Sequence, residues 1–505
     1  MTKTLIGLDY EGVGCVKITK GSLDPAATPD SEVAAFYYNS KWSKDVNVNL
    51  FVNPDKFTSN FIEGGTSYAD ATHIGFLPLF STTNFNYNYY RKSYFPGLAY
   101  NMPLMDYKPI DYATGRFQTN RVIQSLVGYE RRGGLWSTRN LSWYSNAYFT
   151  NISPSVTLEH GVFFQSLFEV PEGSSFGERA SILVWNLPGD SSPIIDGTPL
   201  APVSGQRQIE INAAACRVSK PGYDVRTATS TQLAFDSSKR PPKIIAANDI
   251  LIPVGYSEYD TGLELPPGCV IDAAFYPEGA TVYYPCNPQN VEFGAEHWIA
   301  GSKIAFNANA ACRARFIVVS PPAATQTAGQ NNVLRQFEQA GRNVVQFLRP
   351  GAGEDPSFGD IILDSRWPCL QMIAEGYIPV GNGELQHPIA TNSDGLFPIV
   401  KFMTVHGSGG STKPVLPTSW GAEVRSPKVA RSAVYRVGWT NVITSGDTCF
   451  CTVTSSEVRF FTFRGNPIGQ RYANGGAVDN NRITYEYDPA PIVGIRYFVF
   501  GVPAE

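Results

Sequence analysis

The stretch "CRVSKPGYDVRTATSTQLAFDSSKR", residues 216–240, holds the clearest local pattern of the chain. A short apolar run is followed by Pro221-Gly222, a polar excursion, and a second apolar run that ends in Asp236-Ser237. Proline next to glycine favours a tight turn, and short apolar runs between turn signals are typical of strands. The stretch therefore predicts two β-strands joined by a polar connection.

The same features return in the same order in "VVQFLRPGAGEDPSFGDIILDSRWPCLQMIAEGYIPV", residues 344–380. The turn is now Pro350-Gly351, the second run ends in Asp364-Ser365, and the proline precedes the aspartate by 14 residues instead of 15. In both regions a later strand ends in "IPV". One loop deletion reconciles the spacings, so we interpret the two regions as copies of one unit.

A looser third version opens the chain as "CVKITKGSLDPAATPDSEVAAFYYNSKW", residues 15–42. Here Cys15 stands where Cys216 does. Lys20-Gly21 replaces the proline-glycine pair, and Asn39-Ser40 replaces Asp-Ser. Any β-rich sequence yields some turns and apolar strands by chance, but the ordered start and end signals argue against chance and for three related modules.

The ends of the modules also agree, since each combines an arginine, a run of β-forming residues and a terminating proline: "RASILVWNLP" (179–188), "RARFIVVSPP" (313–322) and "IRYFVFGVP" (495–503). Apolar runs too short for a helix indicate strands covered on both faces. Residues 186–206 and 321–332 are turn-rich and are expected to be linkers. We predict an all-β chain of three related β-sandwich-like modules in tandem, joined by Pro/Gly/Ser-rich linkers: an enlarged aromatic-rich module at 1–190, a second at 205–323 and a third at 340–505.

One segment departs from the β pattern. In "NNVLRQFEQAGRNVVQFL", residues 331–348, Val333, Phe337 and Ala340 are spaced as on one face of a helix. Gly341 then offers a stop. We expect a short connecting helix at the head of the third module.

Composition limits the partners of the chain. Charged residues make up 17% of it and the formal net charge is -4, so no global positive field attracts nucleic acid. No apolar run approaches the roughly 18 residues of a spanning helix, and "MTKTLIGLDYEGVG" lacks the apolar segment of a signal peptide, so we expect no membrane insertion. The eight thinly spread cysteines favour reduced, buried thiols, and the "CFC" of residues 449–451 is expected to pack structurally and not to bind metal.

The sequence offers no persuasive catalytic, cofactor or metal site. "GSSFG", residues 173–177, has the spacing of a nucleophile elbow, but the residues after it predict a strand where that motif needs a helix. Carboxylate pairs such as Asp106 with Asp111, or Glu258 with Asp260, are expected to be turn and edge residues. We therefore expect no enzyme, no cofactor and no metal ion.

Two aromatic-rich stretches of the first module are candidates for ligand binding. In "NFNYNYY", residues 84–90, asparagine and aromatic residues alternate, so on a strand the rings project to one face. A second patch, "WSTRNLSWYSNAYF", spans residues 136–149. Rings stack on sugars and amides bind hydroxyls, although aromatic faces also form cores and subunit interfaces. The glycan-binding candidates are Phe85, Tyr87, Tyr89, Trp143, Tyr144 and Tyr148.

The run "RVSKPGYDVRTATSTQLAFDS", residues 217–237, resembles a motif of bacteriophage tail structural proteins. In that family, short β-rich proteins open with an "(I/V)SKPGxDV" turn, continue to "FDS" and end on a "VRYxVF"-type strand. The matching positions here are residues 218–225, 235–237 and 495–500, and the first module departs most from the motif. The resemblance implies a component at or near the distal end of a phage tail, and the motif supplies no catalytic residues.

From the residues and the resemblance we expect a non-enzymatic virion structural protein of a phage tail tip, baseplate or fibre that contributes to assembly and host-surface adsorption. Two alternatives stay open: a glycan-degrading adsorption enzyme, and a neck or capsid decoration protein. The expected partners are other phage tail proteins, further copies of this chain in a homo-oligomer such as a trimer, and a host surface glycan. The expected location is the virion tail, after assembly in the host bacterial cytoplasm.

Overall fold

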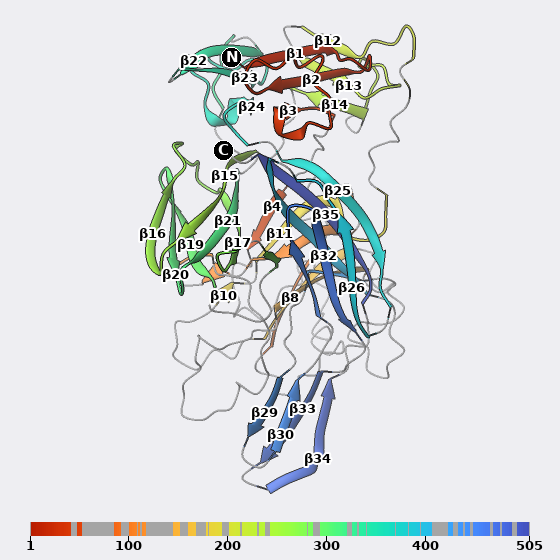
Figure 1. Ribbon diagram of the computed structural model, residues 1–505, viewed down its shortest axis with the longest axis vertical. Helices are drawn as coiled ribbons and strands as arrows, with labels where there is room; N and C mark the ends of the chain where they lie inside the picture. Colours follow the sequence, from red (N-terminus) through yellow and green to blue (C-terminus); the bar gives the residue numbers. More distant parts are fainter. Residues whose placement is uncertain are drawn as a thin grey trace.

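The computed structural model is built almost entirely from antiparallel β-strands, which confirms the predicted all-β class (Figure 1). It describes residues 2–41, 48–52, 85–91, 100–117, 145–151, 160–167, 178–193, 201–320, 326–406, 423–427, 433–444, 448–486 and 492–503, apart from short gaps within these ranges. Within them the helical elements are two 3-10 turns, η1 (Val33–Ala35) and η7 (Phe358–Asp360). None of the described elements is a helix long and apolar enough to cross a membrane.

Three three-stranded antiparallel sheets gather at one end of the molecule, and we call them together the cap (Figure 1). Each contains one copy of the motif, with its second and third strands formed by the two apolar runs. In sheet order the strands are β1 (Lys3–Leu8), β2 (Gly14–Thr19) and β3 (Phe36–Asn39); β12 (Ile209–Ile211), β13 (Cys216–Ser219) and β14 (Leu233–Asp236); and β22 (Leu334–Gln339), β23 (Arg342–Leu348) and β24 (Ile361–Asp364).

The three cap sheets share the same register. In each, the pairing of the second and third strands shifts at the corresponding position. The serine that follows the third strand accepts, at its Oγ, a hydrogen bond from a backbone N–H of the second strand; the pairs are Val16 to Ser40 (3.0 Å), Cys216 to Ser237 (2.8 Å) and Val345 to Ser365 (3.0 Å). The predicted alignment of the first copy is therefore wrong by one residue, because Val16 takes the place of Cys216 and Cys15 does not.

One core is shared by the three cap sheets. Phe235 of the second sheet packs edge-on against Tyr38 of the first, at 6.2 Å between ring centroids, and against Phe347 of the third, at 4.9 Å. A lone three-stranded sheet buries little, so each cap sheet depends on the other two. The shared core consists of Val16, Ile18, Tyr38, Cys216, Val218, Phe235, Val333, Val345, Phe347 and Ile362.

The helix predicted within residues 331–348 is wrong. This segment forms the hairpin β22–β23, in which Leu334 pairs with Phe347 and Gln339 pairs with Arg342. Gly341 adopts a φ of 75°, the left-handed conformation that a tight hairpin turn needs and glycine tolerates. A short apolar pattern cannot by itself separate helix from strand, and here the pairing of β23 with β24 decides for the strand.

Next to the cap, the same order of paired strands occurs three times in the body of the molecule. In each set of six strands, the first, last and third form what we call an inner sheet, and the second, fifth and fourth form an outer sheet. The inner sheets are β4 (Val48–Val52), β11 (Ser181–Pro188) and β6 (Pro103–Tyr107); β15 (Ile244–Ile252), β21 (Cys312–Val319) and β17 (Val270–Tyr276); and β25 (Gln371–Pro379), β35 (Ile492–Pro503) and β27 (Leu396–His406).

The outer sheets have the matching order. They are β5 (Phe85–Arg91), β9 (His160–Leu167) and β8 (Ser145–Asn151); β16 (Gly255–Asp260), β20 (Lys303–Ala308) and β19 (Ala295–Ala300); and β26 (Gly383–Ala390), β32 (Glu457–Arg464) and β31 (Thr448–Val453). We call β1–β11 the first segment, β12–β21 the second and β22–β35 the third.

The three apolar runs that end in proline form the central strands of the inner sheets, β11, β21 and β35. Along β21, Ile317 and Val319 belong to a core shared by the three inner sheets. Phe316 and Val318 belong to the core between the inner and outer sheets of the second segment. Successive side chains point to opposite faces of a strand, so the prediction of strands covered on both faces is confirmed for β21.

Hydrogen-bonded sheets cross the borders of the segments. β28 (Glu423–Arg425) joins the third inner sheet to the first outer sheet, giving seven strands in one sheet, and β18 (Val282–Tyr284) extends the third outer sheet. The division into modules at 1–190, 205–323 and 340–505, and their origin by duplication, stay predictions. The remaining described pairs are β7 (Ile110–Asp111) with β10 (Glu178–Arg179), β29 (Ala433–Val437) with β30 (Thr440–Thr444), and β33 (Ile468–Asn474) with β34 (Ala477–Glu486).

Candidate functional site

A group of buried charges lies where the three inner sheets meet. Asp106 on β6, Asp272 on β17 and Lys401 on β27 each lie on the third strand of their set of six. Lys108 follows β6 and is buried as well. We call these four residues the axis cluster. The first three are the register partners of mid-strand residues on β11, β21 and β35, namely Leu183, Ile317 and Phe498.

In the axis cluster each lysine contacts both aspartates. The Nζ of Lys401 lies 2.6 Å from Asp106 Oδ2 and 2.5 Å from Asp272 Oδ2. The Nζ of Lys108 lies 3.3 Å from Asp106 Oδ2 and pairs with Asp272 Oδ1. Two positive and two negative groups therefore balance. Asp106, expected to be a turn or edge residue, lies on β6 at the edge of the first inner sheet, but it is buried there within the apolar strand "PLMDY" and does not lie in a turn.

The electrostatics of the axis cluster favour the ionised forms of Asp272 and Lys401. Burial raises the pKa of a carboxyl, but Lys108 and Lys401 outweigh this for Asp272 and hold its pKa below the usual range. Burial lowers the pKa of an ammonium, but Asp106 and Asp272 raise the pKa of Lys401. A cavity of about 10 Å³ beside the cluster has room for about one water molecule. The charged groups of the site thus pair with one another and join strands of the three inner sheets.

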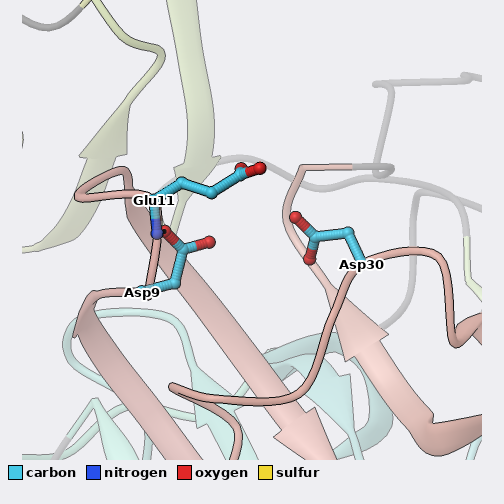
Figure 2. Close-up of side chains that lie close together, drawn as sticks. All are labelled: Asp9, Glu11 and Asp30. Atoms are coloured by element: carbon cyan, nitrogen blue, oxygen red, sulfur yellow. Dashed lines mark hydrogen bonds between the residues drawn. The ribbon is translucent and has the colours of Figure 1, made fainter.

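A second group of charges lies in the first cap sheet (Figure 2). Asp9 follows β1, Glu11 lies in the same turn, Asp30 precedes β3, and their carboxylate oxygens lie within 4.8 Å of one another. Such oxygens suit a hard cation, but two lysines are already in place. The Nζ of Lys17 lies 2.9 Å from Asp9 and 2.7 Å from Asp30. The Nζ of Lys41 lies 2.5–2.8 Å from all three acids.

We call Asp9, Glu11, Lys17, Asp30 and Lys41 the cap cluster. Its two lysines favour the ionised forms of Asp9 and Asp30. Burial alone would raise the pKa of Asp9, but hydrogen bonds from Lys41 and Lys17 lower it to about 2. Burial alone would lower the pKa of Lys17, which is fully buried, but Asp30 and Asp9 raise it. The ammonium groups hold the positions that a metal cation would need. We interpret the cap cluster as an ion-pair network that ties the turn after β1 to the loop before β3.

His297 on β19 packs as an aromatic side chain. Its ring stacks on Phe117 at 5.6 Å between centroids and also contacts Phe275 and Phe306. Its Nδ1 lies 3.0 Å from the carbonyl oxygen of Ala295. Burial lowers the pKa of His297 to about 4, and the positive charge of Lys108 acts in the same direction. The ring is therefore neutral near pH 7.

The described cysteines are also buried and free. Burial raises the pKa of each of these thiols, to about 11 for Cys15. Cys449 and Cys451 both lie in the core between the inner and outer sheets of the third segment, where packing was expected. A thiol with a raised pKa is a poor nucleophile, so these side chains act as apolar packing groups.

The backbone register brings several of the glycan-binding candidates together. β5 holds Phe85, Tyr87 and Tyr89, β8 holds Tyr148, and both strands pair with β9. Tyr89 and Tyr148 are the register partners of Phe163 on its two sides, so three aromatic residues form one row across the first outer sheet. The other two candidates, Trp143 and Tyr144, lie outside the described residues. A glycan-binding role stays a prediction for all six.

The remaining sequence candidates are partly described. Glu258 and Asp260 lie on β16, an edge strand of the second outer sheet, as expected. Glu258 pairs at the surface with Lys303, at 2.6 Å. Asp111 lies on the short strand β7. The "GSSFG" stretch falls outside the described residues.

Sequence reasoning missed the axis cluster and the lysines of the cap cluster. The available signal is a single charged residue inside an apolar strand: Asp272 in "VIDAAFY", Lys401 in "LFPIVKFMTVH" and Lys17 in "GCVKIT". A charge rarely enters such a strand unless it is paired. This signal identifies the residues, but it does not identify their partners.

No protein-family model matches the chain, and no curated protein or solved structure matches it either. Function therefore has to be inferred from the residues and their arrangement.

Proposed function

We propose that the chain is a non-enzymatic structural protein of a bacteriophage virion, located at the tail tip, in the baseplate or in a fibre. Support comes from the resemblance of residues 217–237 to a motif of phage tail structural proteins, and from what these residues do in the fold. The motif forms the turn and strands of a cap sheet.

The observation that carries the proposal is the use of the motif residues. In "SKPGYDV", Ser219 Oγ donates a hydrogen bond to the carbonyl oxygen of Tyr223 at 2.7 Å, and Gly222 takes a φ of 84°. The Asp224 carboxylate accepts a bond from the Arg226 N–H at 3.0 Å, which closes an Asx turn. A motif whose polar groups shape a turn suits assembly better than catalysis.

The charged groups of the described residues support a non-enzymatic role as well. The axis and cap clusters consist of mutually paired ions, whose carboxyl pKa values are lowered where a shift is resolved. General acid catalysis near neutral pH needs a carboxyl with a raised pKa, and a nucleophilic thiol needs a lowered one. The described clusters and thiols have the opposite shifts.

We propose further that the first outer sheet contributes to host-surface adsorption through the aromatic row at Tyr89, Phe163 and Tyr148. The proposed partners are other phage tail proteins and a host surface glycan. The proposed location is the virion tail, after assembly in the host bacterial cytoplasm. The rival functions are a glycan-degrading adsorption enzyme and a neck or capsid decoration protein.

The test is to locate the chain on purified phage particles by mass spectrometry and immunogold labelling. Label at the distal tail is the expected result. Label at the neck or head would favour the decoration alternative, and no chain in any particle would overturn the proposal. Release of reducing ends from host polysaccharide by the purified chain would establish the enzyme alternative instead.

A further inference from the structure

In each segment, a short piece of chain pairs with a strand of another segment. In the first segment, Phe117 follows β6 and β7 and pairs with His297 on β19 of the second segment. Each of the two residues donates its backbone N–H to the carbonyl oxygen of the other, at 3.0 Å. Arg116 adds to the junction, because its guanidinium lies 3.8 Å from the ring centroid of Trp298. The first segment thereby borders the second outer sheet.

The other two junctions repeat this arrangement. β18 follows β17 in the second segment and pairs with β31 of the third, with Val282 opposite Val453. β28 follows β27 in the third segment and pairs with β8 of the first, with Val424 opposite Phe149. In all three cases the pairing piece of chain follows the third strand of its own set of six and pairs with the fourth strand of another set. The third segment returns to the first, so the three segments form a closed ring.

The inner sheets occupy the middle of this ring. They share one core, in which Trp185 of the first segment stacks on Phe500 of the third at 5.5 Å between centroids. The axis cluster brings together Asp106, Asp272 and Lys401, which hold matching positions on β6, β17 and β27. In an oligomer, a head-to-tail interface that returns to its starting subunit makes a closed ring. Here the same geometry is completed within one chain.

The cap repeats the threefold pattern at one end of the ring. β1, β12 and β22 are corresponding strands, and each is an edge strand in the described sheets (Figure 1). Each also has one exposed large apolar side chain, at a different register position in each sheet: Leu8 (58% exposed) lies opposite Gly14, Ile211 (59%) opposite Cys216 and Leu334 (36%) opposite Phe347. Unpaired edges with exposed apolar residues are places where another protein can add.

We propose that this chain is the single-chain counterpart of a homotrimer, and that its cap docks as one copy onto a partner of threefold symmetry through β1, β12 and β22. The match lies in the three backbone edges, which hold corresponding places in the three cap sheets, so that each can pair with one of three identical partner copies. The docking rests on the proposed virion function, whereas the single-chain ring does not. The single-chain ring also replaces the homotrimer expected from the sequence with a monomer.

The ring is tested by the mass of the purified chain in light scattering. The expected mass is that of one chain, 55.2 kDa. A particle of three times that mass at micromolar concentration would overturn the single-chain counterpart, because the chain would then be one subunit of a homotrimer and not a replacement for it.

The docking is tested by a triple variant, Leu8→Lys, Ile211→Lys and Leu334→Lys, introduced into the phage genome. Loss of three apolar contacts should lower the amount of chain per purified particle by about tenfold or more. The matched control places lysines at three exposed apolar residues of the body, Leu251, Val254 and Tyr256, and should be incorporated as the wild type is.

The outcomes separate the two proposals. If the wild-type chain is absent from particles, the virion function fails and the docking fails with it. If the wild type and the control are incorporated and the cap variant is incorporated equally, the docking alone is overturned. Circular dichroism and thermal melting of the purified cap variant verify that it folds.

Discussion

The axis cluster and the cap cluster are both networks of lysines and carboxylates, but they join residues at very different separations along the chain. In the cap cluster, Lys17 pairs with Asp9 eight residues away, and Lys41 pairs with Asp30 eleven residues away. In the axis cluster, Lys401 pairs with Asp106 across 295 residues. The first network therefore shapes one sheet, whereas the second joins three segments. The comparison teaches that the consequence of a buried ion pair depends on which elements its members come from.

The axis cluster also bears on how the three inner sheets pack against one another. Buried ion pairs often stabilise a fold less than apolar residues would, and their best-attested role is to specify one arrangement among similar ones. The three inner sheets have the same strand order and share one apolar core, and apolar contacts alone specify orientation weakly. Two aspartates and one lysine at matching positions are neutralised, with Lys108, only when all three sheets meet. We infer that the axis cluster selects this packing.

The largest expected effect comes from breaking the axis cluster with Lys401→Met. The variant leaves Asp106 and Asp272 buried with Lys108 alone, and losing one partner of a buried pair costs about 3–5 kcal/mol of unfolding free energy. The measurement is urea unfolding followed by circular dichroism, which reports on the strands of the whole chain. The control Lys303→Met removes a surface partner and should leave the urea midpoint unchanged. Equal losses in the two variants would contradict the role of the axis.

A pH effect of slightly smaller size is expected at the border of the first and second segments. The pKa of His297 falls from 6.5 to about 4 on folding, so the unfolded chain binds more protons between these values. The contribution of the neutral His297 ring to the unfolding free energy is fully present above pH 6.5. It is lost as the pH falls toward 4, by up to about 3 kcal/mol. His297→Phe removes this loss. The check is the difference in unfolding free energy between wild type and variant, measured at pH 7 and again at pH 4. The same difference at both pH values would contradict a buried neutral ring.

A smaller and local effect is expected in the cap cluster. Lys17→Met leaves Lys41 in contact with both Asp9 and Asp30, so the loss should be about 1–2 kcal/mol. Because the network lies within one cap sheet, amide hydrogen exchange should rise in β2 and stay unchanged in β17. Faster exchange in both strands would show that the two clusters are coupled and would break the comparison.

The sequence predicted the parts of the fold that depend on neighbouring residues. The turn-and-strand motif and the apolar runs such as "RFIVV" identified the cap strands and the central strand β21. The spacing of Val333 and Phe337 misled, because a pattern of this length fits a helix as well as a strand. Strand order and the closure of the ring depend on contacts between distant segments, which no local pattern encodes.

The candidate sites also divide into those that neighbouring residues predict and those that depend on contacts between distant segments. The cap cluster lies within 33 residues, from Asp9 to Lys41, and its acids and lysines are visible in one stretch of sequence. The axis cluster draws on three stretches, and nothing in "VIDAAFY" indicates that Asp272 will meet Lys401. The aromatic candidates were found from composition, whereas the row formed by Tyr89, Phe163 and Tyr148 depends on the pairing of three strands.

The central claim is that three similar segments form one body held at the axis, and differential scanning calorimetry of the full chain tests it most directly. The three segments share an inner core and a cap core, and they pair with one another through their backbones. We therefore expect one cooperative transition, with a calorimetric enthalpy that matches the van't Hoff value. Lys401→Met should move the whole transition to lower temperature. Three separable transitions, only one of which moves in Lys401→Met, would contradict the claim and would indicate independent modules in tandem.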